Sequence, residues 1–536
     1  MRNNNYLKAF FIFAYAFAAM LSQGFLTTVS ADNFQKGVEA YEEKDFVTAF
    51  ESWLPLANEG NIYAQYNLFI LHDNFYAKSD GLFDIFKAKK WLNSAAQNGL
   101  AQAQYTLGVR FSDKLDPIRW LVFASLQDHI PATEKIKELG VGKLHIAAQT
   151  STSSEFLAVL TDAKDLNVRD KRGLTPLHYA ANNLKTSKNI TILLEAGAEP
   201  TLIDSEGNTP LHFAYSPNDD RERIDIFLQA GIDPNSKNNN GYTPLHYFSK
   251  YGSFQSVQAL LEAGGDVNAT TKWAETPLHM AVHNPNAYEV IQLLIKAGAD
   301  KEAKDFSGLT PIFSAVTMGE RSSIISLIDH GIDINSRSKE GFTPFHYATN
   351  NRSMEQKSLV KLLLQLGADV NSRSLEGETP LYSFARNGNS ESIRLMIDAG
   401  ANVNARDQHG YSPLYSAALH GNTTGLKVLI EAGAEIDAKS EFGTTPLVGA
   451  VRTGTQRGEI VLILLSHGAK INNRDYQGNT PLHVARVPEK IEVLLDNGAD
   501  PSAKNEFGML PWDFIKNNDE IKGTKAYWRL NDARFD

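Results

Sequence analysis

The sequence predicts an all-α repeat solenoid, and two observations carry this prediction. The tetrapeptide Thr-Pro-Leu-His or a near copy returns every 33 to 36 residues, and intact copies begin at Thr175, Thr209, Thr243, Thr276 and Thr480. A fixed period of this length is typical of stacked units of secondary structure. The chain of 536 residues is also too long for one compact core, a limit that a repeat array avoids because each unit packs only on its neighbours.

The first 31 residues have the layout of a secretory signal peptide. Arg2 and Lys8 give a short basic start, residues 9–21 form an unbroken apolar stretch, and small residues end the segment at Ala31. A permanent membrane anchor is the alternative, but a membrane helix needs about 20 apolar residues. We therefore predict a signal peptide over 1–31, an exported chain in a periplasm or outside the cell, and no stable membrane anchor after cleavage.

The composition excludes several classes of function. The chain has no cysteine, which rules out disulfides, thiolate metal sites and cysteine catalysis. The formal net charge is −10 and there is no basic run, so nucleic acid is not an expected partner. The sequence also lacks phosphate-binding loops and the metalloprotease and serine-hydrolase motifs. We therefore expect no cofactor, no metal and no catalytic residues.

Residues 32–111 contain a shorter repeat of their own. The pentapeptide AQYNL at 64–68 matches AQYTL at 103–107, and Gly60 and Gly99 stand in front of the two copies. A glycine in the left-handed conformation ends a helix, so we predict antiparallel helix pairs. These residues resemble Sel1-like repeats, relatives of the tetratricopeptide family, and the resemblance implies a helical stack used for protein contacts. The pattern stops after Gly108, and we expect an irregular helical joint over residues 112–138.

A longer array of units is expected over residues 139–516. In one unit, Gly173 allows a turn, Thr175 is placed to cap a helix and Pro176 fits its first position. A second helix ends at Gly197, and the extended stretch after it forms a finger. Degenerate copies of the tetrapeptide begin at Thr310, Thr343, Thr379, Ser412 and Thr445.

The two halves of this unit, at this period, resemble ankyrin repeats over residues 139–516. The resemblance implies about twelve units with short β-hairpin fingers and degenerate units at both ends. Extra residues near 351–357 and 453–458 are expected to be insertions between the two helices of a unit. The tail, residues 517–536, is expected to fold back as a last cap over the apolar end of the stack.

A histidine occupies the same position in seven units, after the Leu of the tetrapeptide. A metal site needs ligands that converge, whereas equivalent residues of stacked repeats lie about 10 Å apart. In the ankyrin family this histidine hydrogen-bonds backbone near the repeat junction, so the resemblance implies a structural role. Replacement by Phe313 and Val448 in other units favours the same interpretation. The seven histidines are His145, His178, His212, His246, His279, His346 and His483.

Large apolar side chains at two positions of the unit are the candidate contacts of a protein partner. One position directly follows the histidine on the first helix, and the other lies beside the finger glycine. Aromatic residues are favoured at interfaces because they bury much surface and carry a polar handle. The alternative is that they pack between fingers or fill the groove. The candidates are Tyr179, Phe213, Tyr247, Met280 and Tyr347 on the first helices, and Trp273, Phe306, Phe442, Tyr476 and Phe507 on the fingers.

These observations predict an exported, monomeric and non-catalytic scaffold or adaptor that binds a protein through its fingers and inner helix face. A second hypothesis is an effector delivered to the cells of another organism, because ankyrin repeats are common in such proteins. A third is a hydrolytic enzyme that uses His129 with Asp128 or Glu134 in the joint, although a surface loop is the simpler explanation of these residues.

Overall fold

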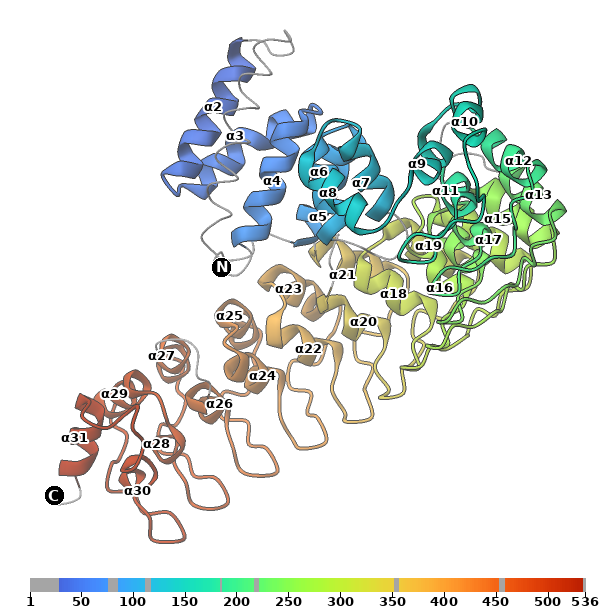
Figure 1. Cartoon of the computed structure of the whole chain (residues 1–536). Coiled ribbons are helices and arrows are strands. Elements are labelled where there is room, and N and C mark those ends of the chain that lie inside the picture. The colour runs from blue at the N-terminus through green and yellow to red at the C-terminus, as the bar shows by residue number, and fades with distance from the viewer. Residues whose placement is uncertain are drawn as a thin grey trace. The chain divides into compact units, whose positions relative to one another are not determined.

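The computed structural model describes residues 28–75, 85–110, 117–183, 186–215, 221–350, 356–452 and 458–533. In these ranges the chain consists of α-helices and two short 3₁₀ helices, without a β-strand (Figure 1). It divides into two compact units, residues 1–248 with 255–265 and residues 249–254 with 266–536. The predicted helical repeat architecture is confirmed.

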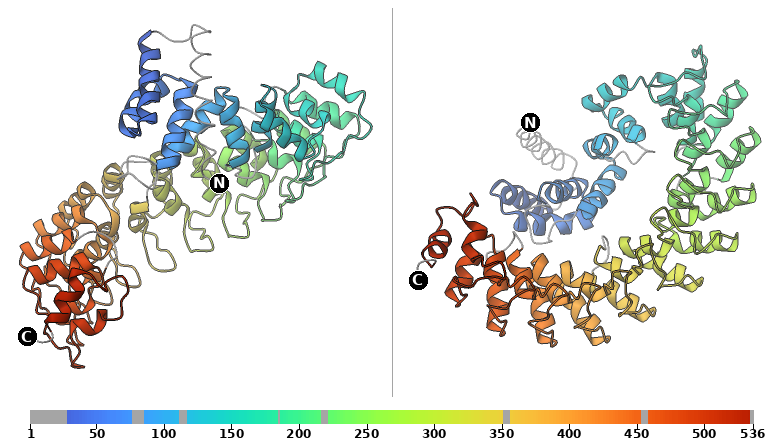
Figure 2. Two further views of the ribbon diagram at one scale, coloured as in Figure 1. Left: turned by 60° about the vertical axis from the view of Figure 1, so that its left-hand side comes forward. Right: turned by 90° about the horizontal axis from the view of Figure 1, so that it is seen from below.

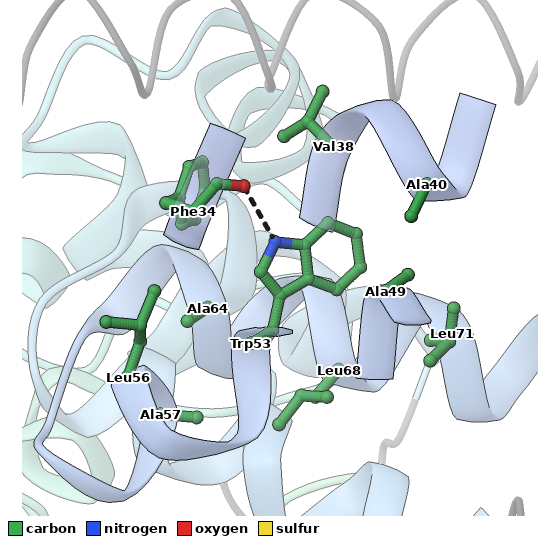
Figure 3. Close-up of a cluster of buried hydrophobic side chains, with 10 residues drawn as sticks. All are labelled: Phe34, Val38, Ala40, Ala49, Trp53, Leu56, Ala57, Ala64, Leu68 and Leu71. Carbon is green, nitrogen blue, oxygen red and sulfur yellow. Dashed lines mark hydrogen bonds between the residues drawn. The ribbon is translucent and has the colours of Figure 1, made fainter. Parts of the chain in front are cut away.

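The first unit opens with five helices: α2 (Thr28–Glu42), α3 (Phe46–Asn58), α4 (Ile62–Phe75), α5 (Ile85–Gln97) and α6 (Ala101–Arg110). The predicted signal peptide lies outside the described residues except for residues 28–31, which belong to α2. Trp53 is fully buried beside Phe34, and its Nε1 donates a hydrogen bond to the carbonyl oxygen of Phe34 at 3.2 Å (Figure 3). This bond satisfies the polar atom of the largest side chain in the cluster, so the ring can be buried without an unpaired donor.

The two matching pentapeptides occupy equivalent places in this helical stack. Gln65 Nε2 donates to the carbonyl oxygen of Ala57 at 3.0 Å, and Gln104 Nε2 donates to the carbonyl oxygen of Ala96, also at 3.0 Å. The glycines between the helices, at positions 60 and 99, have φ values of 94° and 98°. The two segments are therefore structural copies of each other, and their assignment to the Sel1-like family stays a prediction.

The predicted joint is helical where it is described, with α7 (Pro117–Ser125) and α8 (Ile130–Glu138). His129 caps α8, and its Nδ1 accepts a hydrogen bond from the amide of Ala132 at 3.3 Å. Its Nε2 lies 2.9 Å from Oε1 of Gln102, and its ring packs on Tyr105 with centroids 4.8 Å apart. Both ring nitrogens of His129 thus have structural partners.

Pairs of helices follow along the rest of the chain, and the division between the two units falls in the pair α14 and α15. The first helices are α9 (Lys143–Thr150), α11 (Pro176–Ala181), η1 (Pro210–Phe213), α14 (Pro244–Tyr251), α16 (Pro277–Ala281), α18 (Pro311–Met318), α20 (Pro344–Tyr347) extended by η2 (Ala348–Asn350), α22 (Pro380–Asn387), α24 (Pro413–His420), α26 (Pro446–Arg452), α28 (Pro481–Val484) and α30 (Pro511–Ile515). The second helices are α10 (Ser153–Leu160), α12 (Lys188–Glu195), α13 (Arg221–Gln229), α15 (Phe254–Glu262), α17 (Ala287–Lys296), α19 (Arg321–Asp329), α21 (Gln356–Gln365), α23 (Ser390–Asp398), α25 (Thr423–Glu431), α27 (Glu459–Ser466), α29 (Pro488–Asp496) and α31 (Lys525–Asp532).

The local signals in the sequence place these helices. In α11, Thr175 has extended backbone at the N-cap and Pro176 is the first helical residue. The turn after α12 contains Gly197 at φ 98°, where a side chain would be strained. In the second unit the pairs stack one after another, as the yellow to red ribbons of Figure 2 show.

The fingers, which connect one helix-pair repeat to the next, are loops closed by a tight turn. In the finger at 204–208, the amide of Gly207 donates to the carbonyl oxygen of Asp204 at 3.1 Å, and the amide of Asp204 donates to that of Asn208 at 3.0 Å. The β-hairpin fingers that the resemblance implied are not found in the described residues. One turn and one closing bond are too few to form a ladder, because side chains such as Asp204 take the remaining amides.

The tail forms the second helix of the last pair. In α31, Tyr527 packs against Trp512 of α30 with ring centroids 4.5 Å apart, and Arg529 pairs with Asp496 of α29 at 2.5 Å. The predicted insertions lie mostly outside the described residues, which omit 351–355 and 453–457. None of the helices that the structure describes is long and apolar enough to cross a membrane.

Candidate functional site

The repeated histidine joins one helix-pair repeat to the next repeat along the chain. Nδ1 of His178 accepts a hydrogen bond from the amide of Thr175 at 3.1 Å, so the ring proton is on Nε2. Nε2 lies 3.1 Å from the carbonyl oxygen of Asn208 in the next unit and donates to it. The same Nε2 bond recurs from His212 to Tyr242, from His279 to Leu309, from His346 to Glu378 and from His483 to Met509.

Six of the repeated histidines bond protein atoms through both ring nitrogens, so that neither nitrogen is left for a ligand: His145, His178, His212, His279, His346 and His483. Burial lowers the pKa of His178, His212 and His346 to about 4, so these rings are neutral near pH 7. Within the described ranges, no group of three or more His, Asp or Glu side chains is placed to hold a metal ion. The structural interpretation of the histidine is therefore confirmed by its hydrogen bonds.

Four of the five candidates on the first helices are buried, and the fifth, Tyr347, is half-buried. The expectation that they form an exposed face is wrong for Tyr179, Phe213, Tyr247 and Met280, which are 3%, 5%, 6% and 7% exposed. These side chains fill the space between neighbouring repeats. The ring of Tyr179, for example, packs edge-on against His145 of the preceding repeat, with ring centroids 5.0 Å apart. Tyr347 is half-buried and packs in the same way on Phe313, at 5.3 Å.

Polar contacts hold these rings in place as well. The Tyr179 hydroxyl donates to Oδ2 of Asp170 at 3.0 Å, and burial raises the pKa of this tyrosine well above its usual range. The Tyr247 hydroxyl instead accepts a hydrogen bond from the side-chain amide of Asn238 at 3.1 Å. These side chains belong to the core of the array.

The finger candidates are exposed. We define a finger tip as the two residues before the turn glycine, or before Ala274, which replaces that glycine in one unit. The aromatic tip residues are between 45% (Trp273) and 72% (Phe306) exposed. Ala274 has φ 58° and its amide donates to the carbonyl oxygen of Thr271 at 3.0 Å, so this finger keeps the turn of the others. The aromatic tip residues are Trp273, Phe306, Phe442, Tyr476 and Phe507.

Exposed apolar tips are confined to the second unit. Leu375 is 74% exposed at the same position, and sequence analysis missed it because only aromatic residues were sought there. The tips of the first unit are polar, with Lys171-Arg172, Ser205-Glu206 and Asn239-Asn240. In Figure 1 the fingers of the second unit project from one side of its helices. The second unit thus presents a series of six apolar tips.

Backbone bonds hold neighbouring tips in register. The amide of Phe306 donates to the carbonyl oxygen of Trp273 at 2.8 Å, and the amide of Tyr476 donates to that of Phe442 at 3.1 Å. Equivalent bonds join Leu375 to Glu340, Gln408 to Glu376, Glu441 to His409 and Glu506 to Gln477. The spacing of the tips is therefore set by the fold and not by flexible side chains.

A second set of contacts runs along the same fingers. One basic side chain in each finger donates to the backbone carbonyl of the equivalent residue in the next, for example Arg373 to Arg406 at 2.5 Å and Arg406 to Lys439 at 2.7 Å. We call this set the cation ladder. Its donors are Lys304, Arg337, Arg373, Arg406, Lys439 and Arg474, and it ends at the carbonyl oxygen of Lys504.

An open pocket of about 700 Å³ lies among these fingers, lined by residues that include Lys439, Glu441 and Tyr476. In it Arg406 pairs with Glu435 at 2.6 Å. The pocket combines an aromatic wall with acidic and basic groups, and it lacks an arrangement of nucleophile and base. Its chemistry suits the binding of a side chain.

The sequence is similar to known repeat proteins. A family model described as ankyrin repeats (three copies) matches residues 144–221, 214–305, 302–374, 352–440 and 437–505, well over half of the chain. Protein phosphatase 1 regulatory subunit 27 of Homo sapiens is 43% identical over 60 residues, which are 11% of this chain and 39% of that protein, and the Mus musculus protein matches equally. An ankyrin repeat protein of fowlpox virus (strain NVSL) is 41% identical over 54 residues, 10% of this chain and 12% of that protein. The matches thus span 39% or less of these relatives. From the extent of the family match, this chain belongs to the ankyrin repeat family.

Proposed function

We propose that the chain is an exported, non-catalytic scaffold that binds a protein partner along the finger tips of its second unit. The observation that carries this proposal is the series of six exposed apolar tips, held in register by backbone hydrogen bonds. Ankyrin repeats are protein-interaction modules, and one similar protein is named as a regulatory subunit of a phosphatase. A binding role without catalysis fits both.

The proposed binding surface does not include the inner helix face, which the sequence had also suggested. The first-helix residues Tyr179, Phe213 and Tyr247 are buried between neighbouring repeats. They therefore cannot contact a partner from the inner helix face. Exposed aromatic side chains give large contact area at low cost in side-chain freedom. The tips Phe306, Phe442 and their neighbours therefore remain as the candidate anchors.

Capture of a partner from extracts of the native host tests the proposal. The full chain is immobilised beside a variant that carries Phe306→Ala, Phe442→Ala, Tyr476→Ala and Phe507→Ala. A matched control carries Tyr288→Ala and Leu462→Ala, which remove exposed side chains (39% and 46%) from the second helices α17 and α27. We expect the tip variant alone to lose the partner. If it retains what the unaltered chain retains, the tips are not the binding surface.

Export is proposed from the sequence of residues 1–31. Fractionation of host cells, with sequencing of the N-terminus, tests it: a mature chain that begins at Asp32 in the periplasm is the expected result. Uncleaved chain in the cytoplasm would contradict it. Accumulation outside the producing cell would favour the effector hypothesis, and light scattering of the purified chain tests whether it is a monomer.

A further inference from the structure

We infer that the finger tips of the second unit take a partner segment that carries regularly spaced arginine or lysine side chains. This inference rests on the proposed function and deepens it, because it states the chemistry of the partner. It starts from the carboxylates that share the tips with the apolar residues. The tips pair Leu375 with Glu376, Glu441 with Phe442 and Glu506 with Phe507.

The tip carboxylates are exposed and unpaired. Within the described part of the chain, the side chains of Glu376, Glu441 and Glu506 make no ion pair or hydrogen bond. Two basic groups of the cation ladder near them bond to other groups. Arg406 pairs with Glu435 at 2.6 Å, and Lys439 Nζ donates to the carbonyl oxygen of Arg474 at 3.0 Å. The tips therefore offer negative charge beside apolar surface.

One finger shows how a tip holds a cation. The ammonium of Lys339, in the neighbouring finger, lies 5.0 Å from the centroid of the Phe306 ring. It also donates a hydrogen bond to the carbonyl oxygen of Phe306. A cation over an aromatic face is attracted by the ring quadrupole. This contact shows that the aromatic ring of an exposed tip holds an ammonium group.

Two later fingers carry a phenylalanine at the other tip position, directly before the turn glycine, without a cation over it. Phe442 and Phe507 are 53% and 67% exposed, and no lysine or arginine of the described residues lies over either ring. Each has a free carboxylate next to it in the chain, Glu441 or Glu506. A partner's guanidinium or ammonium can meet the ring and the carboxylate together. An acidic segment would instead bring like charges together.

The repeat period sets the spacing of the cations in the partner. Stacked units place equivalent tips about 10 Å apart, as packed helices do. An extended segment advances about 3.4 Å per residue. The tips that pair a carboxylate with an apolar residue lie in alternate fingers, because Gln408-His409 and Tyr476-Gln477 stand between them. They are therefore about 20 Å apart and match one basic residue in every sixth position of the partner. This spacing predicts that the partner binds as an extended segment, and that a compact cluster of basic residues fits the tips less well.

Fluorescence anisotropy with labelled peptides tests the inference on the full chain. The probes are a peptide of three Arg-Gly-Ser-Gly-Ser-Gly hexads, the same composition with its arginines clustered at one end, and a peptide of three Glu-Gly-Ser-Gly-Ser-Gly hexads. At about 0.15 M salt we expect the spaced arginine peptide to bind more tightly than the clustered one, and the glutamate peptide not to bind. Failure of the spaced peptide to bind, or equal binding of all three, would overturn the inference.

Variants locate the site. Phe442→Ala with Phe507→Ala, and separately Glu441→Gln with Glu506→Gln, are each expected to weaken binding by about tenfold, the combined worth of two exposed contacts. The charge-matched control carries Glu289→Gln and Glu489→Gln, in the first turns of α17 and α29, and should bind within about twofold of the unaltered chain. Equal loss in the control would mean that net charge alone attracts the peptide, which contradicts a site at the tips.

The outcomes separate this inference from the proposed function. If partner capture depends on the tips but the spaced arginine peptide does not bind, the tips bind a partner of other chemistry and only this inference fails. If the tip variants affect neither partner capture nor peptide binding, both fail.

Discussion

Nε2 of His178 lies 3.1 Å from the carbonyl oxygen of Asn208, thirty residues further along the chain. Nδ1 of the same ring accepts a hydrogen bond from the amide of Thr175, which it can do only while the imidazole is neutral. A buried ring of this kind ties the stability of the stack to pH.

We predict that the array loses stability between pH 6.5 and 4. Burial lowers the pKa of His178, His212 and His346 to about 4, from an ordinary value of 6.5. The unfolded chain therefore binds more protons than the folded chain in this window, so stability is complete above the unfolded pKa and falls as the pH falls. At pH 5 each of these histidines costs about 2 kcal/mol.

Thermal unfolding followed by circular dichroism at pH 7.5 and pH 5 measures this effect. His178→Gln should lower the unfolding temperature at pH 7.5 and reduce its further fall at pH 5. His409→Gln, a substitution of an exposed histidine, is the control variant. An unfolding temperature that is the same at both pH values would contradict the prediction.

Replacement of Ala274 by glycine is expected to stabilise the second unit. Ala274 is one of three described non-glycine residues with positive φ, at 58°, and a left-handed alanine costs about 1 kcal/mol. Ala274→Gly should recover about that amount in urea unfolding monitored by circular dichroism.

The reverse change in another finger is the matched control. Gly341 has φ 78°, and a Cβ atom there would lie 2.8 Å from the amide nitrogen of Leu375. Gly341→Ala is therefore expected to destabilise by about 1–3 kcal/mol. If both variants changed stability in the same direction, positive φ would not explain the effect at Ala274.

The cation ladder predicts a role for Arg373 that depends on its hydrogen bond. Its Nη2 donates to the carbonyl oxygen of Arg406 at 2.5 Å. Arg373→Ala should lower the free energy of unfolding by about 1 kcal/mol, because the bond is charge-assisted but exposed. Arg373→Lys should retain part of it, since Lys304 and Lys439 fill the same position. Lys361→Ala on α21, outside the ladder, is the control and should be neutral.

The sequence was sufficient where a structure depends on neighbours in the chain. Thr175 and Pro176 start α11, and Gly197 supplies the turn after α12, because capping and positive φ are local properties. The histidine brace was also foreseeable from the resemblance. Leu375 shows that the position in the unit was a better guide to exposure than the type of side chain.

The sequence was insufficient where a contact joins residues of different units. All six residues of α11 are buried, so no polar face in the sequence distinguishes Tyr179 from a surface residue. The cation ladder depends on carbonyl groups about thirty residues away, which no motif records. Both features are produced by stacking.

Because Tyr179 is buried and Phe507 is exposed, replacement by alanine is expected to have different effects on stability and binding at the two positions. Tyr179→Ala removes a ring packed on His145 and a hydroxyl bonded to Asp170, and should cost about 3–5 kcal/mol. Phe507→Ala removes a side chain that is 67% exposed, and should change stability by less than about 0.5 kcal/mol. Urea unfolding measures the loss of stability in Tyr179→Ala. Partner capture or peptide binding measures the loss of binding expected in Phe507→Ala. A stable Tyr179→Ala variant that loses the partner would restore the inner helix face as a binding surface, because only an exposed ring could act in that way.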